Sequence, residues 1–160
     1  MKYDVFLSFR GKDTRNNFTD HLYTALCQKG FVTFKDDQKL ERGDTISPAI
    51  LQAIQDSRLS VVIFSRNYAS SAWCLDELER IHTCMKAQGL IVLLVFYHVK
   101  PSEVREQTGR FAKAFATHEE DFSLNVDKVQ RWKSALTQVA ELSGWELQDR
   151  FLFVTLLFHH

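Results

Sequence analysis

The chain has 160 residues, enough for one domain with a hydrophobic core. Its 20 Lys and Arg balance its 20 Asp and Glu, so the formal net charge is zero. That balance gives no support to a nucleic-acid surface or an anionic-membrane surface, both of which need a basic excess or a clear basic patch. The three cysteines are too widely spaced for a disulfide framework or a CxxC metal site, and they favour a reducing compartment. No signal peptide is recognisable, and no apolar run reaches the roughly 20 residues that span a bilayer.

The first half of the chain predicts alternating strands and helices. An apolar run at 3–9 predicts a buried strand, and an amphipathic stretch beginning at Thr14 predicts a helix closed by Gly30. A second strand is expected at 31–34. The polar segment 35–46 has no periodicity, which is typical of a long exposed loop. Ser47 followed by Pro48 then predicts the N-cap and first position of the next helix.

The second half continues the alternation. Strands are expected at 59–65 and 90–97, with a helix between them that Gly89 closes. A helix over 101–119 is expected to be interrupted near Gly109, and an amphipathic helix over 126–144 is expected to end at Gly144. A fifth strand cannot be placed from the pattern. The domain is taken as 1–147, and the apolar tail at 148–160 is left as a truncation, an artificial addition or a last strand.

Continuously apolar strands that alternate with helices indicate a parallel sheet covered on both faces. The predicted fold is therefore α/β: a flavodoxin-like, doubly wound parallel sheet of about five strands, flanked by helices on both faces. Ligands of such sheets bind outside the carboxyl ends of the strands. Four loops meet at that edge, at 10–15, 35–46, 66–72 and 98–102.

The stretch SSAWCLDELERI, residues 70–81, places three carboxylates on a short helix at this edge. At about 100° per residue, Glu77 falls at the border of the apolar stripe, one turn after Trp73 and on the same side. Asp76 and Glu79 are expected to be surface charges. Glu77 is a candidate catalytic group shielded by Trp73. The alternatives are an ion pair of Glu77 with Arg80 or Lys86 and a core position for Trp73.

The loop FRGKDTR, residues 9–15, places Arg10 and Arg15 beside a helix start, which is a plausible phosphate site. The loop lacks the glycine spacing of a P-loop and of a dinucleotide-binding fingerprint. For Arg15 the alternative is an ion pair with Asp13 or Asp20.

Five stretches carry a resemblance to a known family: KYDVFLSFRGKDTRNNFTDHLYTAL, FKDDQKLERGDTI, VVIFSRNYASSAWCLDEL, FYHVKPSEVREQTGRFAKAF and WKSALTQVAELSGW. In this order and spacing they resemble the plant TIR domain, the Toll/interleukin-receptor-like domain of disease-resistance receptors. The resemblance runs from about Tyr3 to Trp145. It departs from the family where His98-Val99-Lys100-Pro101 stands in place of the usual Asp-Val-Asp-Pro.

The resemblance implies an enzyme that cleaves NAD⁺ or NADP⁺ at the nicotinamide–ribose bond, with nicotinamide and ADP-ribose or cyclic variants as products. It implies Glu77 as the catalytic residue. The implied substrate-binding residues are Arg10, Gly11, Arg15, Ser71 and Trp73. The residues implied for the loop that gates the site are Asp36, Asp37, Gly43 and Ile46. No cofactor and no metal is implied. A single carboxylate can suffice, because the nicotinamide leaving group departs neutral and needs no acid.

The resemblance also implies activation by self-association with other TIR domains, through surfaces near Asp20 and His21 and near Gly144. The expected role is immune signalling and cell death in the cytoplasm or the nucleus, without a membrane partner, and nucleic acid is an unlikely partner. A non-catalytic scaffold that only binds other TIR domains is the alternative. Glu77 together with Trp73 favours the enzyme.

Overall fold

A computed structural model describes residues 1–14, 18–36, 46–123, 125–142 and 144–147. Its centre is a five-stranded parallel sheet in the order β2-β1-β3-β4-β5. The strands are β1 (Tyr3–Ser8), β2 (Thr33–Lys35), β3 (Ser57–Phe64), β4 (Ile91–Tyr97) and β5 (Gly144–Leu147). This order and the parallel pairing confirm the predicted doubly wound, flavodoxin-like class.

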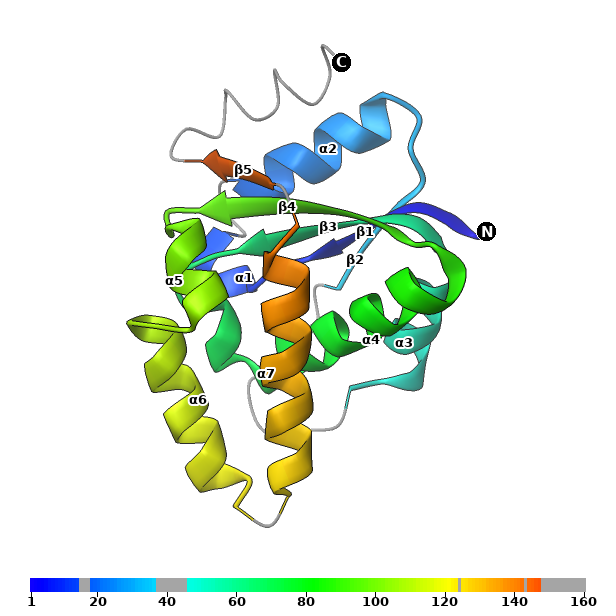
Figure 1. Ribbon diagram of the computed structural model, residues 1–160. Helices are drawn as coiled ribbons and strands as arrows, with labels where there is room; N and C mark the ends of the chain where they lie inside the picture. Colours follow the sequence, from blue (N-terminus) through cyan, green and yellow to red (C-terminus); the bar gives the residue numbers. More distant parts are fainter. Residues whose placement is uncertain (15–17, 37–45, 124, 143, 148–160) are drawn as a thin grey trace.

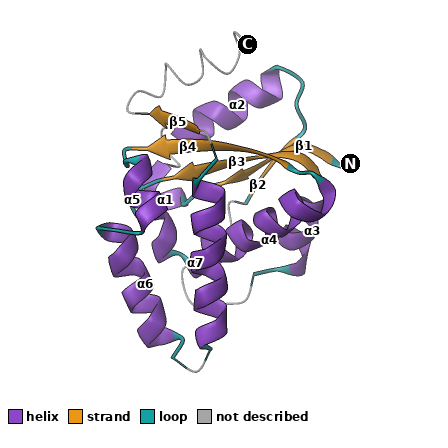
Figure 2. Ribbon diagram, in the orientation of Figure 1, coloured by secondary structure: helices purple, strands orange, loops and turns teal. Residues whose placement is uncertain are grey.

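The helices lie on both faces of the sheet (Figures 1 and 2). They are α1 (Gly11–Thr14), α2 (Asp20–Gln28), α3 (Pro48–Gln55), α4 (Ala72–Gln88), α5 (Pro101–Glu106), α6 (Arg110–Asp121) and α7 (Val126–Ala140). Helix α2 covers one face, and α3, α4 and α7 cover the other, where α4 packs between α3 and α7. A sheet covered in this way needs apolar residues on both sides of every central strand.

Alternation along β1 decides which side chains meet which helices. Val5 and Leu7 point into the core under α2, whereas Phe6 points into the larger core under α3, α4 and α7. Successive strand residues face opposite sides, so Ser8 shares the face of Phe6. The last residue of β1 therefore carries a hydroxyl into an otherwise apolar space beneath α4.

Most predicted elements are confirmed, with ends that shift by one to three residues. Ser47 caps α3 by accepting a hydrogen bond from the Ala49 amide at 3.2 Å. Gly89 ends α4 in the left-handed conformation, with φ of 72°. Gly109 separates α5 from α6. The helix predicted to end at Gly30 is confirmed as α2, but its predicted start at Thr14 is wrong, because Thr14 is the last residue of α1 and α2 begins at Asp20.

The expected helix end at Gly144 is also wrong. Helix α7 ends at Ala140, and Gly144 opens β5, the fifth strand that the pattern did not reveal. Gly144 pairs with Leu94 of β4. A Cβ at position 144 would lie 2.7 Å from the Leu94 Cβ and 2.9 Å from the Leu94 carbonyl oxygen, so close approach of β5 to β4 explains the glycine.

Candidate functional site

Glu77 lies at the carboxyl end of β1 and is completely buried, with an exposed fraction of 0%. Ser8 Oγ donates a hydrogen bond to Glu77 Oε1 at 2.8 Å. The carboxylate therefore lies deeper than the border position that helix periodicity predicts. Neither Arg80 nor Lys86 forms an ion pair within the described part of the chain, so the alternative ion pairs are wrong. Helix α4 turns Glu77 toward β1, where Ser8 supplies the polar partner.

Tyr68 extends this buried cluster. Its hydroxyl lies 2.7 Å from Ser8 Oγ and 3.2 Å from the Cys74 carbonyl oxygen. Ser8 has one hydroxyl hydrogen, which it donates to Glu77, so the hydrogen between Ser8 and Tyr68 comes from Tyr68. Burial, followed by the nearby Cys74 and Glu77, raises the pKa of Tyr68 well above its ordinary value of 10.0. Tyr68 therefore stays protonated at ordinary pH and remains a donor.

Ser8 and Tyr68 are not among the residues that the sequence predicts for the site. Ser8 carries a local signal, because it is the one aliphatic hydroxyl in the strand YDVFLS. Tyr68 carries none, because its 3₁₀ turn, Tyr68–Ser70, reaches Ser8 only in the folded chain. We call Ser8, Tyr68 and Glu77 the buried acid cluster.

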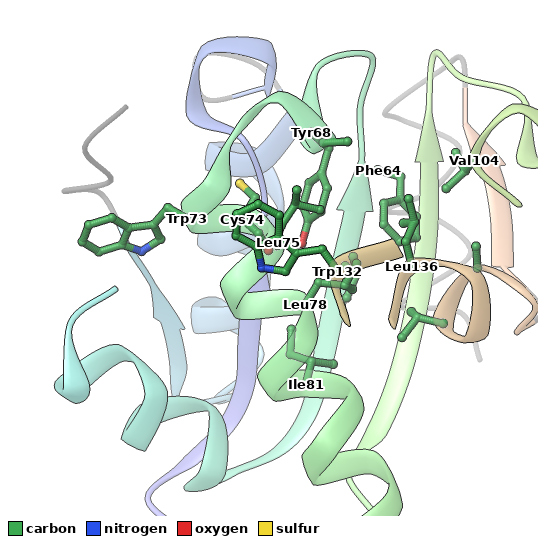
Figure 3. Close-up of a cluster of buried hydrophobic side chains, with 14 of the residues drawn as sticks. Phe64, Tyr68, Trp73, Cys74, Leu75, Leu78, Ile81, Val104, Trp132 and Leu136 are labelled. Carbon is green, nitrogen blue, oxygen red and sulfur yellow. Dashed lines mark hydrogen bonds between the residues drawn. The ribbon is translucent and has the colours of Figure 1, made fainter. Parts of the chain in front are cut away.

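Trp73 lies one turn before Glu77 on α4 and is 8% exposed. Its indole points away from Tyr68, Phe64 and Leu136 (Figure 3), toward the β2 and α3 side of the domain. Trp73 Nε1 is buried and has no hydrogen-bond partner among the described residues. Ser71, another predicted substrate-binding residue, caps α4: its Oγ accepts the Cys74 amide hydrogen at 3.1 Å.

The sequence predicts that Asp76 and Glu79 are both surface charges. That prediction is confirmed for Glu79 and wrong for Asp76. Glu79 is partly exposed and pairs with Arg131 at 3.0 Å. Asp76 is half-buried and accepts a hydrogen bond from Trp132 Nε1 at 3.0 Å. Burial raises the pKa of Asp76 above its ordinary value of 3.8, while the nearby Lys128 and the Trp132 hydrogen bond lower it. Asp76 faces α7, which helix periodicity alone could not show.

The first loop is organised by Asp13 of α1. Its carboxylate accepts hydrogen bonds from Ser65 Oγ at 2.6 Å and from the Asn67 amide at 2.9 Å, so it ties the end of β1 to the end of β3. Arg10 Nη1 pairs with the same carboxylate at 3.1 Å. Gly11 is the first residue of α1 and lies in this loop. Arg15 lies outside the described residues.

The predicted gating loop is described only at its ends. Asp36 follows β2 and Ile46 precedes α3, and both are 5% exposed. Asp37 and Gly43 lie outside the described residues.

The residues predicted for self-association lie on two elements. Asp20 and His21 open α2, where His21 is exposed and Asp20 pairs with Lys35 of β2 at 3.4 Å. Gly144 lies on β5, as described above. Their role in association stays a prediction.

Three open cavities lie beyond the carboxyl ends of β3 and β4, and Glu77 lines none of them. In the described ranges, no group of three or more His, Cys, Asp or Glu is placed to hold a metal ion. Within the same ranges, no helix is long and apolar enough to cross a bilayer. The site is therefore an acid buried at a strand end, beside polar cavities at the same edge.

The fold and this strand-end acid define a flavodoxin-like α/β domain, and comparison with known proteins gives the family. The profile of the TIR domain matches residues 2–152. The chain is 58% identical over 147 residues to the disease resistance protein RPV1 of Vitis rotundifolia, covering 92% of this chain and 10% of that protein. It is 50% identical over 142 residues to the TMV resistance protein N of Nicotiana glutinosa, covering 89% of this chain and 12% of that protein.

A solved structure agrees with these matches. The TIR domains of the activated Roq1 resistosome, which directly recognises the pathogen effector XopQ, superpose with a TM-score of 0.87 at 48% identity, over 98% of each chain. The present chain belongs to the TIR domain family and is similar to the TIR domains of plant disease resistance proteins. It spans about a tenth of the length of the curated relatives that it matches.

Proposed function

We propose that the chain is an NAD⁺ nucleosidase that acts in plant immune signalling and is activated by self-association. The single observation that carries the proposal is Glu77, a carboxylate buried at the carboxyl end of β1 and one helical turn from Trp73. NADP⁺ carries the same nicotinamide–ribose bond and is an equivalent substrate. The relatives are named as resistance proteins, which supports the signalling role.

The reaction breaks the bond between the ribose C1′ and the pyridinium nitrogen. The bonding electron pair passes to the pyridinium nitrogen, so nicotinamide leaves as a neutral molecule and needs no proton. Positive charge develops on the ribose, and a carboxylate in a site that excludes water stabilises that charge strongly. Water then adds at C1′ and releases a proton, which gives ADP-ribose, or the adenine attacks C1′ and closes a ring.

The residues around Glu77 have separate roles in this proposal. Ser8 holds the carboxylate in place through the bond to Oε1, and Tyr68 supplies the hydrogen that satisfies Ser8. The Trp73 indole forms a flat apolar wall beside the ribose. Arg10 and Arg15 attract the pyrophosphate, and Gly11 and Ser71 line the approach to it.

Full burial of Glu77 means that the ribose can reach the carboxylate only after side chains over it move. We take the described arrangement as the resting form of a single copy. In this proposal, contact with a neighbouring TIR domain moves those side chains and opens the site. The resistosome assembly of the Roq1 relative supports such activation by clustering.

The test measures nicotinamide release from NAD⁺ by the purified chain over a range of protein concentrations, with and without a crowding agent. The rate per chain is expected to rise with concentration. Glu77→Gln, which keeps the size of the side chain, is expected to lower the rate by about 100-fold or more. Glu79→Gln on the same helix is the matched control and is expected to leave the rate unchanged.

The full burial of Glu77 also favours the second candidate, an interaction module that turns over nothing. The two candidates predict different outcomes in the same assay. Absence of nicotinamide at every concentration, combined with concentration-dependent association of the chain, would replace the enzyme with the interaction module. Equal rates for Glu77→Gln and the unmodified chain would refute the catalytic assignment of Glu77.

A further inference from the structure

An open groove lies beyond the ends of β3 and β4, separate from the buried acid cluster. Its central cavity, of about 380 Å³, shares Arg66 and His98 with a second cavity of about 580 Å³ that reaches α5. The central cavity shares Asn67 and Arg110 with a third cavity of about 440 Å³ along α6. We call the joined cavities the basic groove, after their cationic residues Arg66, Lys100, Arg110 and Lys113.

None of these four cations has an ion-pair partner in the described part of the chain. Lys35 and Arg131, by contrast, form ion pairs with Asp20 and Glu79. Unpaired cations repel one another and favour the entry of an anion. The groove thus collects positive charge that no ion pair with a described residue neutralises.

Two of the guanidinium groups are held in place by neutral acceptors. Arg66 Nε donates to the His98 carbonyl oxygen at 3.4 Å, and Arg110 Nη1 donates to Asn67 Oδ1 at 3.3 Å. An arginine has five N–H groups, so each side chain keeps donors for a ligand in the cavity. Two oriented guanidinium groups at one cavity suit phosphate oxygens, which arginine binds with paired hydrogen bonds.

Two acids also line the groove, and they do not cancel its charge. The Asp13 carboxylate already accepts hydrogen bonds from Ser65 and from Asn67 and pairs with Arg10. Glu103 lies on the side of the second cavity. Four cations against two acids leave the groove positive, although the whole chain has a net charge of zero.

The segment after β4 gives this chain its own version of the groove. His98 adopts a left-handed conformation, with φ of 57°, and carries the chain from β4 toward Lys100. Asp and His both tolerate this conformation better than most residues. His98 and Lys100 occupy the positions where the resemblance expects two aspartates, so the sequence departs from its family in the direction of positive charge.

We propose that the basic groove binds a diphosphate group, either as inorganic pyrophosphate or as the diphosphate of a nucleotide. The central cavity has the size of a small-molecule site, and its arginines match the ligand in charge and geometry. The site lies at the strand ends, where α/β sheets bind ligands. It is separate from NAD⁺ cleavage and does not depend on it.

The experiment titrates the full chain with inorganic pyrophosphate, in phosphate-free buffer, and follows backbone amides and indole N–H groups by NMR. The amides of Asn67, His98 and Gly109 are expected to shift, while the Trp73 indole N–H, which reports on the Glu77 site, stays unchanged. The double variant Arg66→Gln/Arg110→Gln is expected to weaken binding about tenfold or more, because it removes charge-assisted hydrogen bonds.

Three further variants control the result. Lys86→Gln removes an exposed cation of α4, far along the helix from its N-terminal end, and is expected to leave binding unchanged. His98→Asp/Lys100→Asp places the acids of the family pattern in the groove and is expected to abolish binding. Glu77→Gln is expected to bind pyrophosphate like the unmodified chain, whatever its effect on NAD⁺ cleavage.

A parallel titration with ADP distinguishes the two sources of the diphosphate. Equal affinities for ADP and pyrophosphate would assign recognition to the phosphates alone, and tighter ADP binding that still requires Arg66 and Arg110 would assign a nucleotide. Both results support the diphosphate site. Shifts confined to the Trp73 indole would overturn it. So would a loss of pyrophosphate affinity in Lys86→Gln equal to that in Arg66→Gln/Arg110→Gln. Binding of duplex RNA in the groove without binding of pyrophosphate would also overturn it.

Discussion

The buried acid cluster and the basic groove lie at the same edge of the sheet, yet their charged side chains differ in burial and in hydrogen-bond partners. Glu77 is 0% exposed and is held by a buried hydroxyl chain. The cations of the groove are exposed and have no ion-pair partner in the described ranges. Position at the strand ends is therefore not what distinguishes the two regions.

The difference follows from what covers each strand end. Helix α4 packs on β1, and its Glu77 together with Tyr68 covers Ser8 at the end of the strand. The chain after β4 instead turns outward through the left-handed His98 and leaves room for water between α5 and α6. A covered strand end needs internal hydrogen-bond partners, whereas an open one can leave its cations for a ligand.

Ser8→Ala is expected to have the largest effect on stability. It removes the donor to a buried carboxylate, which lowers the free energy of unfolding by about 2–3 kcal/mol. Ser60→Ala is the matched control, because Ser60 is equally buried in the neighbouring strand and donates to the uncharged Phe6 carbonyl oxygen at 3.1 Å. Urea unfolding measures both. Equal losses would show that the charge on Glu77 adds nothing to the Ser8 contact.

Tyr68→Phe is expected to cost less, about 1 kcal/mol, because the ring stays and Ser8 can still donate to Glu77. A double-mutant cycle with Ser8→Ala isolates the link between the two hydroxyls. The losses are expected to be less than additive. Additive losses would mean that Tyr68 and Ser8 act separately and that the hydroxyl chain is not a unit.

Asp76→Asn tests a half-buried charge beside α7, which is intermediate between the fully buried Glu77 and the exposed cations of the basic groove. The raised pKa of Asp76 means that the folded chain binds this proton more tightly than the unfolded chain. That contribution favours folding at pH below the ordinary value of 3.8 and is lost as pH rises through the raised folded pKa.

Asparagine keeps an acceptor for Trp132 Nε1 and removes the buried charge. The variant is therefore expected to be more stable than the unmodified chain at pH 7, by up to about 1 kcal/mol, with a smaller advantage toward pH 4. Melting temperatures across this range measure the effect. A constant difference at every pH would show that the ionisation of Asp76 has no part in it.

Arg66→Gln and Lys100→Gln are expected to have the smallest effects on stability, within about 0.5 kcal/mol, because both side chains are exposed and unpaired in the described structure. Thermal unfolding in low salt measures them. A loss near that of Ser8→Ala would show that these cations support the fold, and the contrast between the two regions would fail.

The order of strands and helices could be predicted because apolar runs, caps and glycines act locally. Ser47, Gly89 and Gly109 each mark the end of a helix that lies directly beside them in the sequence. The strand β5 could not be found in this way, because Gly144 is explained by its close approach to Leu94 and Phe96 of β4. A glycine before a short strand looks the same in sequence as a glycine after a helix.

Prediction of the site from local sequence signals meets the same limit. Helix periodicity and the family resemblance both selected Glu77, but its depth depends on how α4 lies on β1. Ser8 and Tyr68 meet across 60 positions of sequence, and Asp76 meets Trp132 across 56. Contacts of this kind depend on tertiary packing, so the local sequence pattern does not predict which residues meet.

The hydroxyl of Tyr68 has one hydrogen and two acceptors, Ser8 Oγ and the Cys74 carbonyl oxygen. If Glu77 takes up a proton, the acid can donate to Ser8, Ser8 can rotate its hydrogen to Tyr68, and Tyr68 can turn to Cys74. Every donor keeps an acceptor after this reversal. The cluster can thus exchange an ionised acid for a neutral one by rotating two hydroxyls, without admitting a water molecule or moving the backbone.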